Sequence, residues 1–327
     1  METRTIGNSE IRASVIGLGC NNFALLLKKD ATKVRAIVHK ALDVGITFFD
    51  MAGEHGGGME EVLFADALGG RRHEVVIATK FGQPELMDVV DGELVFNENL
   101  QRRGMSRRWI MQAVEESLRR LKTDYIDLFQ PHMLDATVPI DETMRALDDL
   151  VQQGKVRAIG QAVNNTTAND VVLADDSALA IGSTQFISVQ AGYNILNREA
   201  EATILPLLRA RGMSLIPYSP MANGMLTGKY RLGAPIPAQS RIANVAYVRD
   251  AYYTPANLDL VEKLLPFARD RGFTLSQLAV AWLLSEPLVP SVIAGATSAD
   301  QVAENAGASG KSLSPADRVD LAKLIGR

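Results

Sequence analysis

The sequence contains a single cysteine, Cys20, so it can form no internal disulfide and offers no cysteine partners for a metal centre. No hydrophobic run approaches the roughly 20 residues that a membrane-spanning helix needs, and the first residues lack the apolar segment of a secretory signal. The net charge of −4 gives no electrostatic reason to bind nucleic acid or an anionic membrane. We therefore expect a cytoplasmic protein with no metal site and with neither nucleic acid nor membrane as a partner.

Short apolar runs and amphipathic helical patterns alternate along the chain of 327 residues. In the first helical pattern, Val34, Ile37, Val38 and Ala41 share one face, and Gly45 stands where a C-terminal cap belongs. Continuous runs rich in Val, Ile and Phe are typical of parallel strands that are covered on both faces. The expected strands cover residues 15–19, 47–50, 75–80, 125–130, 156–160, 186–190, 214–218 and 290–294.

This alternation gives eight strand–helix units, which is the pattern of a closed (β/α)8 TIM barrel. Residues 3–13 indicate a β-hairpin ahead of the barrel, and no linker divides residues 1–327, so we expect a single domain. An open doubly wound sheet is the alternative, but its phosphate-binding pattern G-x-G-x-x-G is missing after Gly19. Two connections are unusually long, at residues 82–105 after the third strand and 220–255 after the seventh, and both leave the strand ends where barrel active sites form.

Polar residues collect at the expected C-terminal ends of the strands. Asp50, Lys80 and His132 follow three consecutive strands, and Gln190 and Tyr218 follow later ones. These strand ends share one mouth of a barrel, and clustered titratable groups there mark a functional site more often than a structural accident. Lysine and aspartate on neighbouring strands can pair, which offsets the cost of burying either charge. We therefore predict the active site at this mouth.

Ordered motifs in the chain resemble those of the aldo-keto reductases over nearly its whole length. They are Gly-Leu-Gly-Cys at 17–20, Phe-Phe-Asp at 48–50, Ala-Thr-Lys-Phe-Gly at 78–82, Asp-Tyr-Ile-Asp-Leu at 124–128, Gln-Pro-His at 130–132, Pro-Tyr-Ser-Pro at 217–220, Leu-Thr-Gly-Lys-Tyr at 226–230 and Ser-Val-Ile-Ala-Gly-Ala at 291–296. The resemblance implies reduction of an aldehyde or ketone by NAD(P)H without a metal. It implies Asp50, Lys80 and His132 as three of the catalytic residues, with Lys80 steadying the oxyanion and His132 orienting the carbonyl.

The fourth catalytic position departs from the family. Its members read Asp-Thr-Ala-x-x-Tyr-Gly where this chain reads Asp-Met-Ala-Gly-Glu-His-Gly at 50–56, so His55 replaces the tyrosine acid. No tyrosine can be realigned to it, because the first in the chain is Tyr125. An imidazolium has a reference pKa near 6.5 against about 10 for a phenol, but it is shorter, and Lys80 would disfavour its charged form. We expect carbonyl reduction to be slow or absent, and we expect the glycines after His55 to let it move.

The resemblance also assigns residues to the cofactor, which it implies to be NADP(H), with NAD(H) as the alternative. They would contact nicotinamide, pyrophosphate and adenosine in turn, and they are Asn164, Gln190, Tyr218, Ser219, Met221, Gly224, Leu226, Lys229, Gly295, Thr297, Ser298, Gln301, Glu304 and Asn305. Gly295, Thr297 and Gln301 stand where many relatives aim basic side chains at the 2′-phosphate. Ser298 and the helix N-terminus behind it remain as donors to that phosphate. A family serine beside the asparagine at the fifth strand is also missing.

The natural substrate is open to several interpretations. Three consecutive leucines at 25–27 indicate either an apolar pocket wall or packing beneath a loop, and the first reading predicts an apolar carbonyl compound. The departures from the family fall at the ends of the first, second and fifth strands, which indicates a reshaped mouth on an intact barrel. A non-redox enzyme that uses His55, Glu54 or His132 as a general base, and a non-catalytic cofactor-binding protein that gates a partner, are the alternatives, because fold alone does not fix function.

Overall fold

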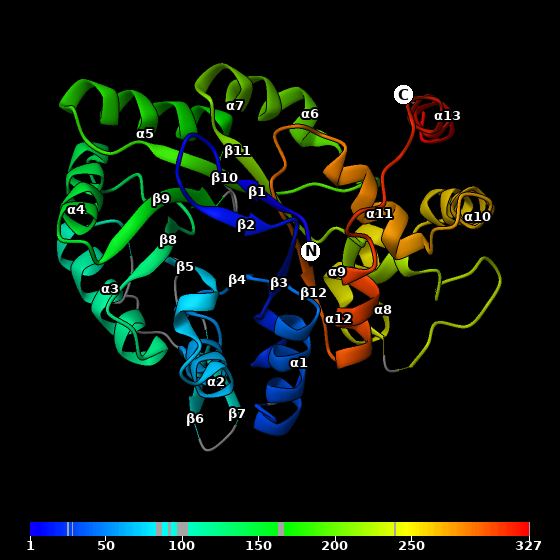
Figure 1. Ribbon diagram of the computed structural model, residues 1–327, viewed down its shortest axis with the longest axis horizontal. Coiled ribbons are helices and arrows are strands. Elements are labelled where there is room, and N and C mark those ends of the chain that lie inside the picture. The colour runs from blue at the N-terminus through cyan, green and yellow to red at the C-terminus, as the bar shows by residue number, and fades with distance from the viewer. Residues whose placement is uncertain are drawn as a thin grey trace.

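A computed structural model describes residues 1–24, 26–27, 29–82, 87–90, 93–96, 104–162, 167–238 and 240–326. Eight parallel strands close into a barrel in the order β10-β11-β12-β3-β4-β5-β8-β9, and helices form the layer outside them (Figure 1). The strands are β3 (Ile16–Gly19), β4 (Phe48–Asp50), β5 (Val76–Phe81), β8 (Ile126–Pro131), β9 (Val156–Ala162), β10 (Phe186–Gly192), β11 (Ser214–Tyr218) and β12 (Val292–Gly295). All eight expected strands are present, each within two residues of its expected bounds, and the predicted (β/α)8 barrel is confirmed.

The outer helices follow the expected alternation. They are α1 (Ala31–Asp43), α2 (Met59–Leu68), α3 (Arg107–Leu121), α4 (Ile140–Gln152), α5 (Ala168–Ile181), α6 (Glu199–Thr203), α7 (Leu205–Arg211), α10 (Pro255–Arg269), α11 (Leu275–Leu284), α12 (Ala299–Ala306) and α13 (Pro315–Leu324). The pattern at residues 199–211 predicts one helix, but the structure divides it into α6 and α7 at Ile204. Pro206 lies in the first turn of α7, where its missing N–H is tolerated, and it would break a continuous helix.

The N-terminal hairpin closes the end of the barrel at which the strands begin. Its antiparallel strands β1 (Thr3–Thr5) and β2 (Arg12–Ser14) flank Ile6 and Gly7, and Ile6 packs among interior residues such as Phe48 and Leu128. Gly7 has a φ of 54° and its N–H donates to Ser214 Oγ at 2.7 Å, while an added Cβ would lie 2.2 Å from a backbone oxygen. The barrel interior is therefore closed at this end, and its open mouth lies at the C-terminal ends of the strands.

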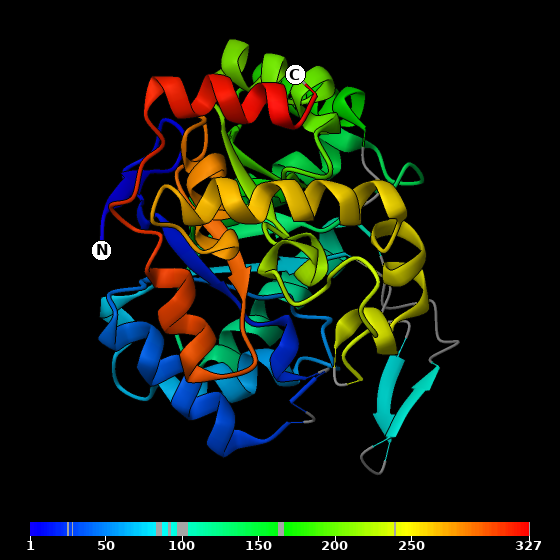
Figure 2. The same ribbon diagram turned by 90° about the vertical axis from the view of Figure 1, so that its right-hand side faces the viewer.

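Both long connections leave those C-terminal ends. The first carries an antiparallel hairpin of β6 (Met87–Val90) and β7 (Glu93–Phe96), which projects away from the barrel in Figure 2. The second carries the 3-10 segment η3 (Ala222–Thr227) and the short helices α8 (Arg241–Asn244) and α9 (Ala246–Tyr252). The expected long loops after the third and seventh strands are therefore present, with secondary structure of their own.

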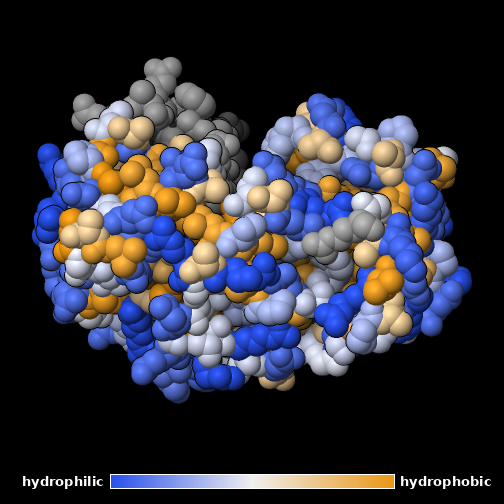
Figure 3. Space-filling view, turned by 90° about the horizontal axis from the view of Figure 1, so that it is seen from above, coloured by the Kyte–Doolittle hydropathy of each residue, from blue (hydrophilic) through white to orange (hydrophobic). Residues whose placement is uncertain are grey.

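The described surface carries few large hydrophobic side chains. Those most exposed include Leu173 and Leu179 on α5, Tyr247 on α9 and Val319 on α13, so they are spread over three helices. On the face seen in Figure 3, hydrophobic residues form patches among hydrophilic ones. None of the described helices combines the length and the apolar composition that crossing a membrane requires.

Candidate active site

Asp50, Lys80 and Gln190 meet inside the mouth of the barrel. Lys80 Nζ donates to Asp50 Oδ2 at 2.7 Å and to the Met51 carbonyl at 2.9 Å, and Gln190 Nε2 donates to Asp50 Oδ1 at 2.8 Å. The three residues lie within the last three residues of strands β4, β5 and β10, and the side chains of the ion pair are only 3% and 9% exposed. Each carboxylate oxygen therefore has a donor, which is the condition for holding a charged pair in a buried site.

The loop after β4 places His55 over this group. Gly56, Gly57 and Gly58 have φ values of 59°, 68° and 80°, which side chains with a Cβ rarely adopt. An added Cβ at Gly58 would lie 2.6 Å from the Arg120 side chain, and one at Gly56 would lie 2.5 Å from a neighbouring Cβ. The glycines are thus required for close packing and for a left-handed path, whereas the sequence suggested only mobility.

His55 is anchored by a buried carboxylate. His55 Nδ1 lies 2.6 Å from Glu60 Oε2, and Glu60 is fully buried in the first turn of α2. The other oxygen, Glu60 Oε1, has no hydrogen-bond partner among the described residues. A helix N-terminus favours negative charge, so the first turn of α2 is a suitable place for this carboxylate.

His132 has a matching arrangement at the end of β8. Its Nδ1 lies 2.7 Å from Glu54 Oε1, and both side chains are about one-tenth exposed. The His55 and His132 rings meet edge to face, with their centroids 5.6 Å apart and their planes at 65°. The mouth therefore holds two facing imidazole rings, and each is fixed through Nδ1 by a different glutamate.

The surroundings shift the pKa of His55 upward. Burial lowers the pKa of His55, and the Lys80 charge lowers it further, but the charge and hydrogen bond of Glu60 outweigh both and raise it above its ordinary value. The Lys80 charge lowers the pKa of His55, as the sequence suggested. The expectation that the imidazolium is disfavoured is nevertheless wrong, because the larger effect of Glu60 was not foreseen. Burial also raises the pKa of the Glu60 carboxyl.

In the second pair, His132 and Glu54, the pKa of the histidine shifts downward. Burial is the main reason that the pKa of His132 falls below its ordinary value, and the hydrogen bond to Glu54 and its charge only partly offset it. Burial would raise the pKa of Glu54, but its hydrogen bond with His132 and the two histidine charges bring it below the usual range. At neutral pH the ionised Glu54 therefore faces a neutral His132.

Sequence reasoning missed Glu60. The available signal was a pair of acids, Glu60 and Glu61, in the first turn of a helix that begins four residues after His55 and has to pack against the barrel. Both are buried, but their partners differ. Glu61 accepts from Thr79 Oγ1 at 2.6 Å and from Arg120 Nε at 2.7 Å, and it does not touch His55.

The residues expected at the pyrophosphate lie in a strained loop after β11. Ser219, Ala222, Asn223 and Gly224 all have positive φ, at 53°, 47°, 55° and 101°. Such strain clusters at ligand clamps. The Ala222 and Gly224 N–H groups donate within the loop, to the Ser219 and Met221 carbonyls, at 2.9 Å each. An added Cβ at Gly224 would lie 3.2 Å from Lys229 Nζ, so a lysine and this loop meet without a side chain between them. Met221 and Leu226 belong to the same turn, and Leu226 is buried.

The other predicted cofactor positions divide into two groups. Tyr218 packs its ring on Gly192 at the mouth, where an added Cβ would lie 3.2 Å from the ring, whereas Asn164 lies outside the described residues. At the far end, Ser298 caps α12, Gln301 Oε1 accepts from the Thr297 N–H at 2.8 Å, and Thr274 donates its hydroxyl to Glu304. Asn305 is buried and bonds the Gly295 carbonyl at 3.5 Å.

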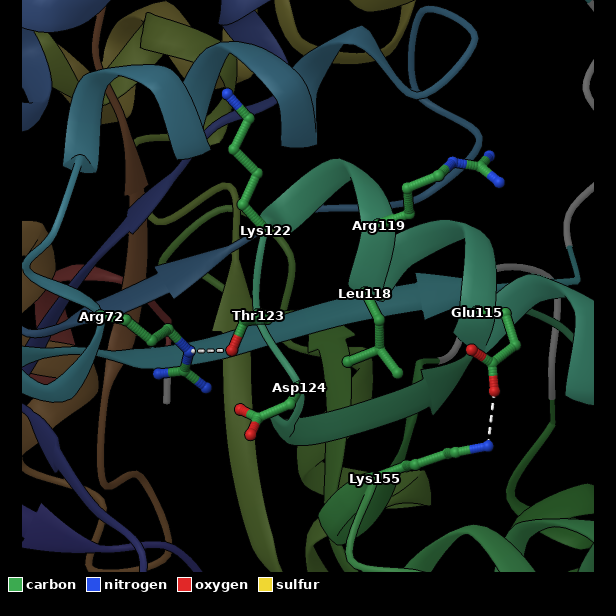
Figure 4. Close-up of a pocket in the computed structure, with 8 residues that line it drawn as sticks. All are labelled: Arg72, Glu115, Leu118, Arg119, Lys122, Thr123, Asp124 and Lys155. Atoms are coloured by element: carbon green, nitrogen blue, oxygen red, sulfur yellow. Dashed lines mark hydrogen bonds and ion pairs between the residues drawn. The ribbon is translucent and has the colours of Figure 1, made fainter.

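A shallow surface pocket of about 790 Å³ lies away from this mouth. Its lining includes Arg72, Arg119, Lys122 and Lys155, which precede or flank the starts of β5, β8 and β9 (Figure 4). Lys122 and Lys155 pair with carboxylates, and Arg72 bonds Thr123 at 3.1 Å. The space lies at the N-terminal ends of the strands, opposite the polar cluster, and we assign it no chemistry.

Comparisons with known proteins agree with this geometry. The model of the Aldo/keto reductase family matches residues 15–325. The chain is 33% identical to a probable voltage-gated potassium channel subunit beta of Oryza sativa subsp. japonica, covering 93% of this chain and 90% of the relative. It is 32% identical to L-glyceraldehyde 3-phosphate reductase of Escherichia coli strain K12, covering 93% and 86%.

A solved structure is similar over almost the entire chain. The holo form of the aldo-keto reductase AKR11C1 from Bacillus halodurans superposes with a TM-score of 0.75 at 30% identity, and the match covers 99% of this chain and 96% of that one. A family match of this extent, a closed barrel and a polar cluster at the C-terminal ends of its strands all point the same way. The chain belongs to the aldo/keto reductase family.

Proposed function

We propose that the protein reduces an aldehyde or ketone with NAD(P)H and that His55 delivers the proton. The observation that carries the proposal is the 2.6 Å contact between His55 Nδ1 and the buried Glu60. A carboxylate at Nδ1 stabilises a protonated ring and leaves Nε2 as the donor toward the substrate. The replacement of tyrosine removed the proton donor of the family. By raising the pKa of His55, Glu60 allows the imidazolium to serve as the proton donor near neutral pH.

The neighbouring groups support the same reaction. When bound, a nicotinamide cofactor supplies the hydride. Lys80, held by Asp50 at 2.7 Å, stabilises negative charge that develops on the carbonyl oxygen. Gln190 uses its NH₂ group on Asp50, which leaves its carbonyl oxygen for the carboxamide of a nicotinamide. We keep the expectation that this acid is slower than a tyrosine, because imidazole is shorter than a phenol.

The cofactor is proposed to lie along the positions that the sequence indicated. The turn at Gly224 with Lys229 fits a pyrophosphate, since the Lys229 ammonium reaches a stretch of backbone that carries no side chain and has no salt-bridge partner in the described chain. The adenosine end is less decisive. Residues 295–305 contain no lysine or arginine and include Asp300 in the first turn of α12. Ser298 and the N-terminus of α12 are the donors that remain for a 2′-phosphate, and on that ground we propose NADP(H), with NAD(H) as the second candidate.

Binding and turnover together test the proposal. Quenching of tryptophan fluorescence by NADPH and by NADH measures affinity, and loss of NADPH absorbance with a panel of aromatic and aliphatic aldehydes measures turnover. His55→Phe removes the proton donor and keeps a planar ring, so we expect binding to persist and reduction to fall by about 10²–10⁴-fold. Reduction at the wild-type rate by this variant would show that His55 is not the acid.

A redox-neutral reaction is the second candidate. The neutral His132 beside the acidic His55 is an arrangement that isomerisation and elimination also use. Turnover of a carbonyl substrate in the complete absence of NAD(P)H would favour this function. The apolar substrate that the leucines predict stays a prediction, since residue 25 lies outside the described chain, Leu26 is exposed and Leu27 is buried.

A further inference from the structure

An arginine of α3 lies against the loop of residues 53–58, which carries one histidine of the mouth and the glutamate that bonds the other. An added Cβ at Gly58 would lie 2.6 Å from Arg120 Nε, and one at Gly53 would lie 2.9 Å from Arg120 Nη2. The guanidinium therefore contacts the loop backbone on both sides of these two functional residues. A larger residue in place of either glycine would displace the arginine or the loop.

The position of Arg120 is itself fixed relative to strand β5. Its Nε donates to Glu61 Oε2 at 2.7 Å, and the other oxygen of this carboxylate accepts from Thr79 Oγ1 at 2.6 Å. Glu61 and Thr79 are fully buried, and the Arg120 side chain is 17% exposed. Thr79 directly precedes Lys80, and successive residues of a strand point to opposite faces. One strand therefore holds Lys80 toward the mouth and, through Glu61, holds the arginine outside the barrel.

The loop backbone has few other supports in the described chain. It makes one hydrogen bond to a barrel strand, from the Gly53 N–H to the Lys80 carbonyl at 2.9 Å. Four of its six residues are glycines, so most of the loop has no side chain that could pack against the barrel. A crevice lined by Gly53, Gly57 and Arg120 already lies beside it. Removal of the guanidinium would extend this crevice along the loop and release both functional residues.

We propose that Arg120 is a positioning residue, which holds Glu54 and His55 at the correct distance from the Asp50–Lys80 pair. The inference rests on the proposed function, in which His55 gives its proton to the carbonyl oxygen as hydride reaches the carbonyl carbon. A proton donor has to lie within hydrogen-bond reach of its acceptor, and a displacement of about 1 Å can cost about 10²-fold in rate. A side chain of the outer helical layer therefore governs the rate of a step inside the barrel mouth.

Arg120→Ala tests the inference in the NADPH-dependent reduction of the panel aldehydes. We expect kcat to fall by about 10- to 100-fold, while the Kd for NADPH changes by less than about twofold because the proposed pyrophosphate turn follows β11. Arg119→Ala is the matched control and should keep the wild-type kcat, since this neighbour on α3 is exposed and lines the pocket at the opposite end of the strands. A fall in kcat of less than about threefold in Arg120→Ala, or an equally large loss of NADPH binding, would overturn the inference.

Chemical rescue separates positioning from general damage to the fold. Arg120→Ala leaves a space of guanidinium size that joins the crevice, so millimolar guanidinium ion should restore most of the lost kcat, whereas sodium ion at the same concentration should not. Arg120→Lys keeps a cation for Glu61 but has no atom in the place of Nη2 at Gly53, so it should fold and still lose kcat. This variant decides the question if Arg120→Ala does not fold. Failure of guanidinium to rescue, or a wild-type kcat in Arg120→Lys, would overturn the inference.

A measurement without substrate separates this inference from the proposed function. The side-chain NMR signals of His55 and His132 should shift in Arg120→Ala and return with guanidinium, because the two rings are in contact, while those of the exposed His73 stay unchanged. If the wild type reduces no panel aldehyde, the proposed function fails, and these signals alone decide the inference. Unmoved signals of His55 and His132 would then reject it. Reduction by the wild type together with an unchanged kcat in Arg120→Ala would support the proposed function and reject the inference.

Discussion

Replacing Glu60 with glutamine should move the pH dependence of reduction. The change keeps the shape of the side chain and removes the charge that lies 2.6 Å from His55 Nδ1. Glu60 raises the pKa of His55, so the acid form of the wild type persists to higher pH, and activity is lost as pH rises through that pKa. Without the carboxylate, burial and the Lys80 charge dominate, and the falling limb should lie at lower pH.

The size of the effect follows from the contact that is lost. A charge-assisted hydrogen bond contributes about 1.5–3 kcal/mol, and 23% exposure of the His55 side chain lets solvent screen part of it. The lower part of this energy range corresponds to a loss of roughly 10- to 50-fold. We therefore expect kcat/KM of Glu60→Gln to fall by this factor at a pH on the falling limb. At low pH, where His55 is protonated in both proteins, the difference should nearly vanish.

The assay combines a rate profile with a titration that needs no substrate. NADPH-dependent reduction is measured across pH in the wild type and in Glu60→Gln, and His55 is titrated by NMR, which is tractable because the chain has four histidines. Glu61→Gln is the matched control, since Glu61 is equally buried but bonds Thr79 and Arg120. An unmoved limb in Glu60→Gln, or an equal displacement in Glu61→Gln, would refute the assignment of His55 as an acid set by Glu60.

Three further perturbations check the rest of the site. His55→Tyr restores the family acid, so NADPH-dependent reduction should rise by about 10²-fold or more, and no gain would argue against a weakened acid. Lys80→Met leaves the Asp50 carboxylate buried without its cation and should lower the free energy of unfolding by about 3–5 kcal/mol in urea denaturation; a loss below 1 kcal/mol would contradict the buried pair. Gly58→Ala combines left-handed backbone strain with a Cβ 2.6 Å from the arginine of α3, whereas Gly154→Ala has the strain alone because nothing lies within 4 Å. The first should therefore cost clearly more than the roughly 1 kcal/mol expected of the second, and equal losses would dismiss the packing argument.

Much of the architecture was predictable because it depends on local patterns. Buried parallel strands such as Ser214–Tyr218 are short apolar runs, and amphipathic helices such as Arg107–Leu121 repeat with a period near 3.6 residues. Helix 199–211 was the exception, since Pro206 in the first turn of a new helix interrupts an otherwise regular pattern. The barrel mouth was predictable in outline as well, because strand ends converge there whatever the loops do.

The sequence by itself determined the barrel, the residues Asp50, Lys80 and His132 at its mouth, and the substitution at position 55. Only the tertiary structure decided how that substitution behaves. The protonation of His55 depends on Glu60, a residue of the next helix whose side chain is brought within 2.6 Å by a left-handed turn of three glycines. Spacing along the chain does not reveal this contact, because burial, distance and charge set a pKa together and all three exist only once the loop has folded onto the barrel.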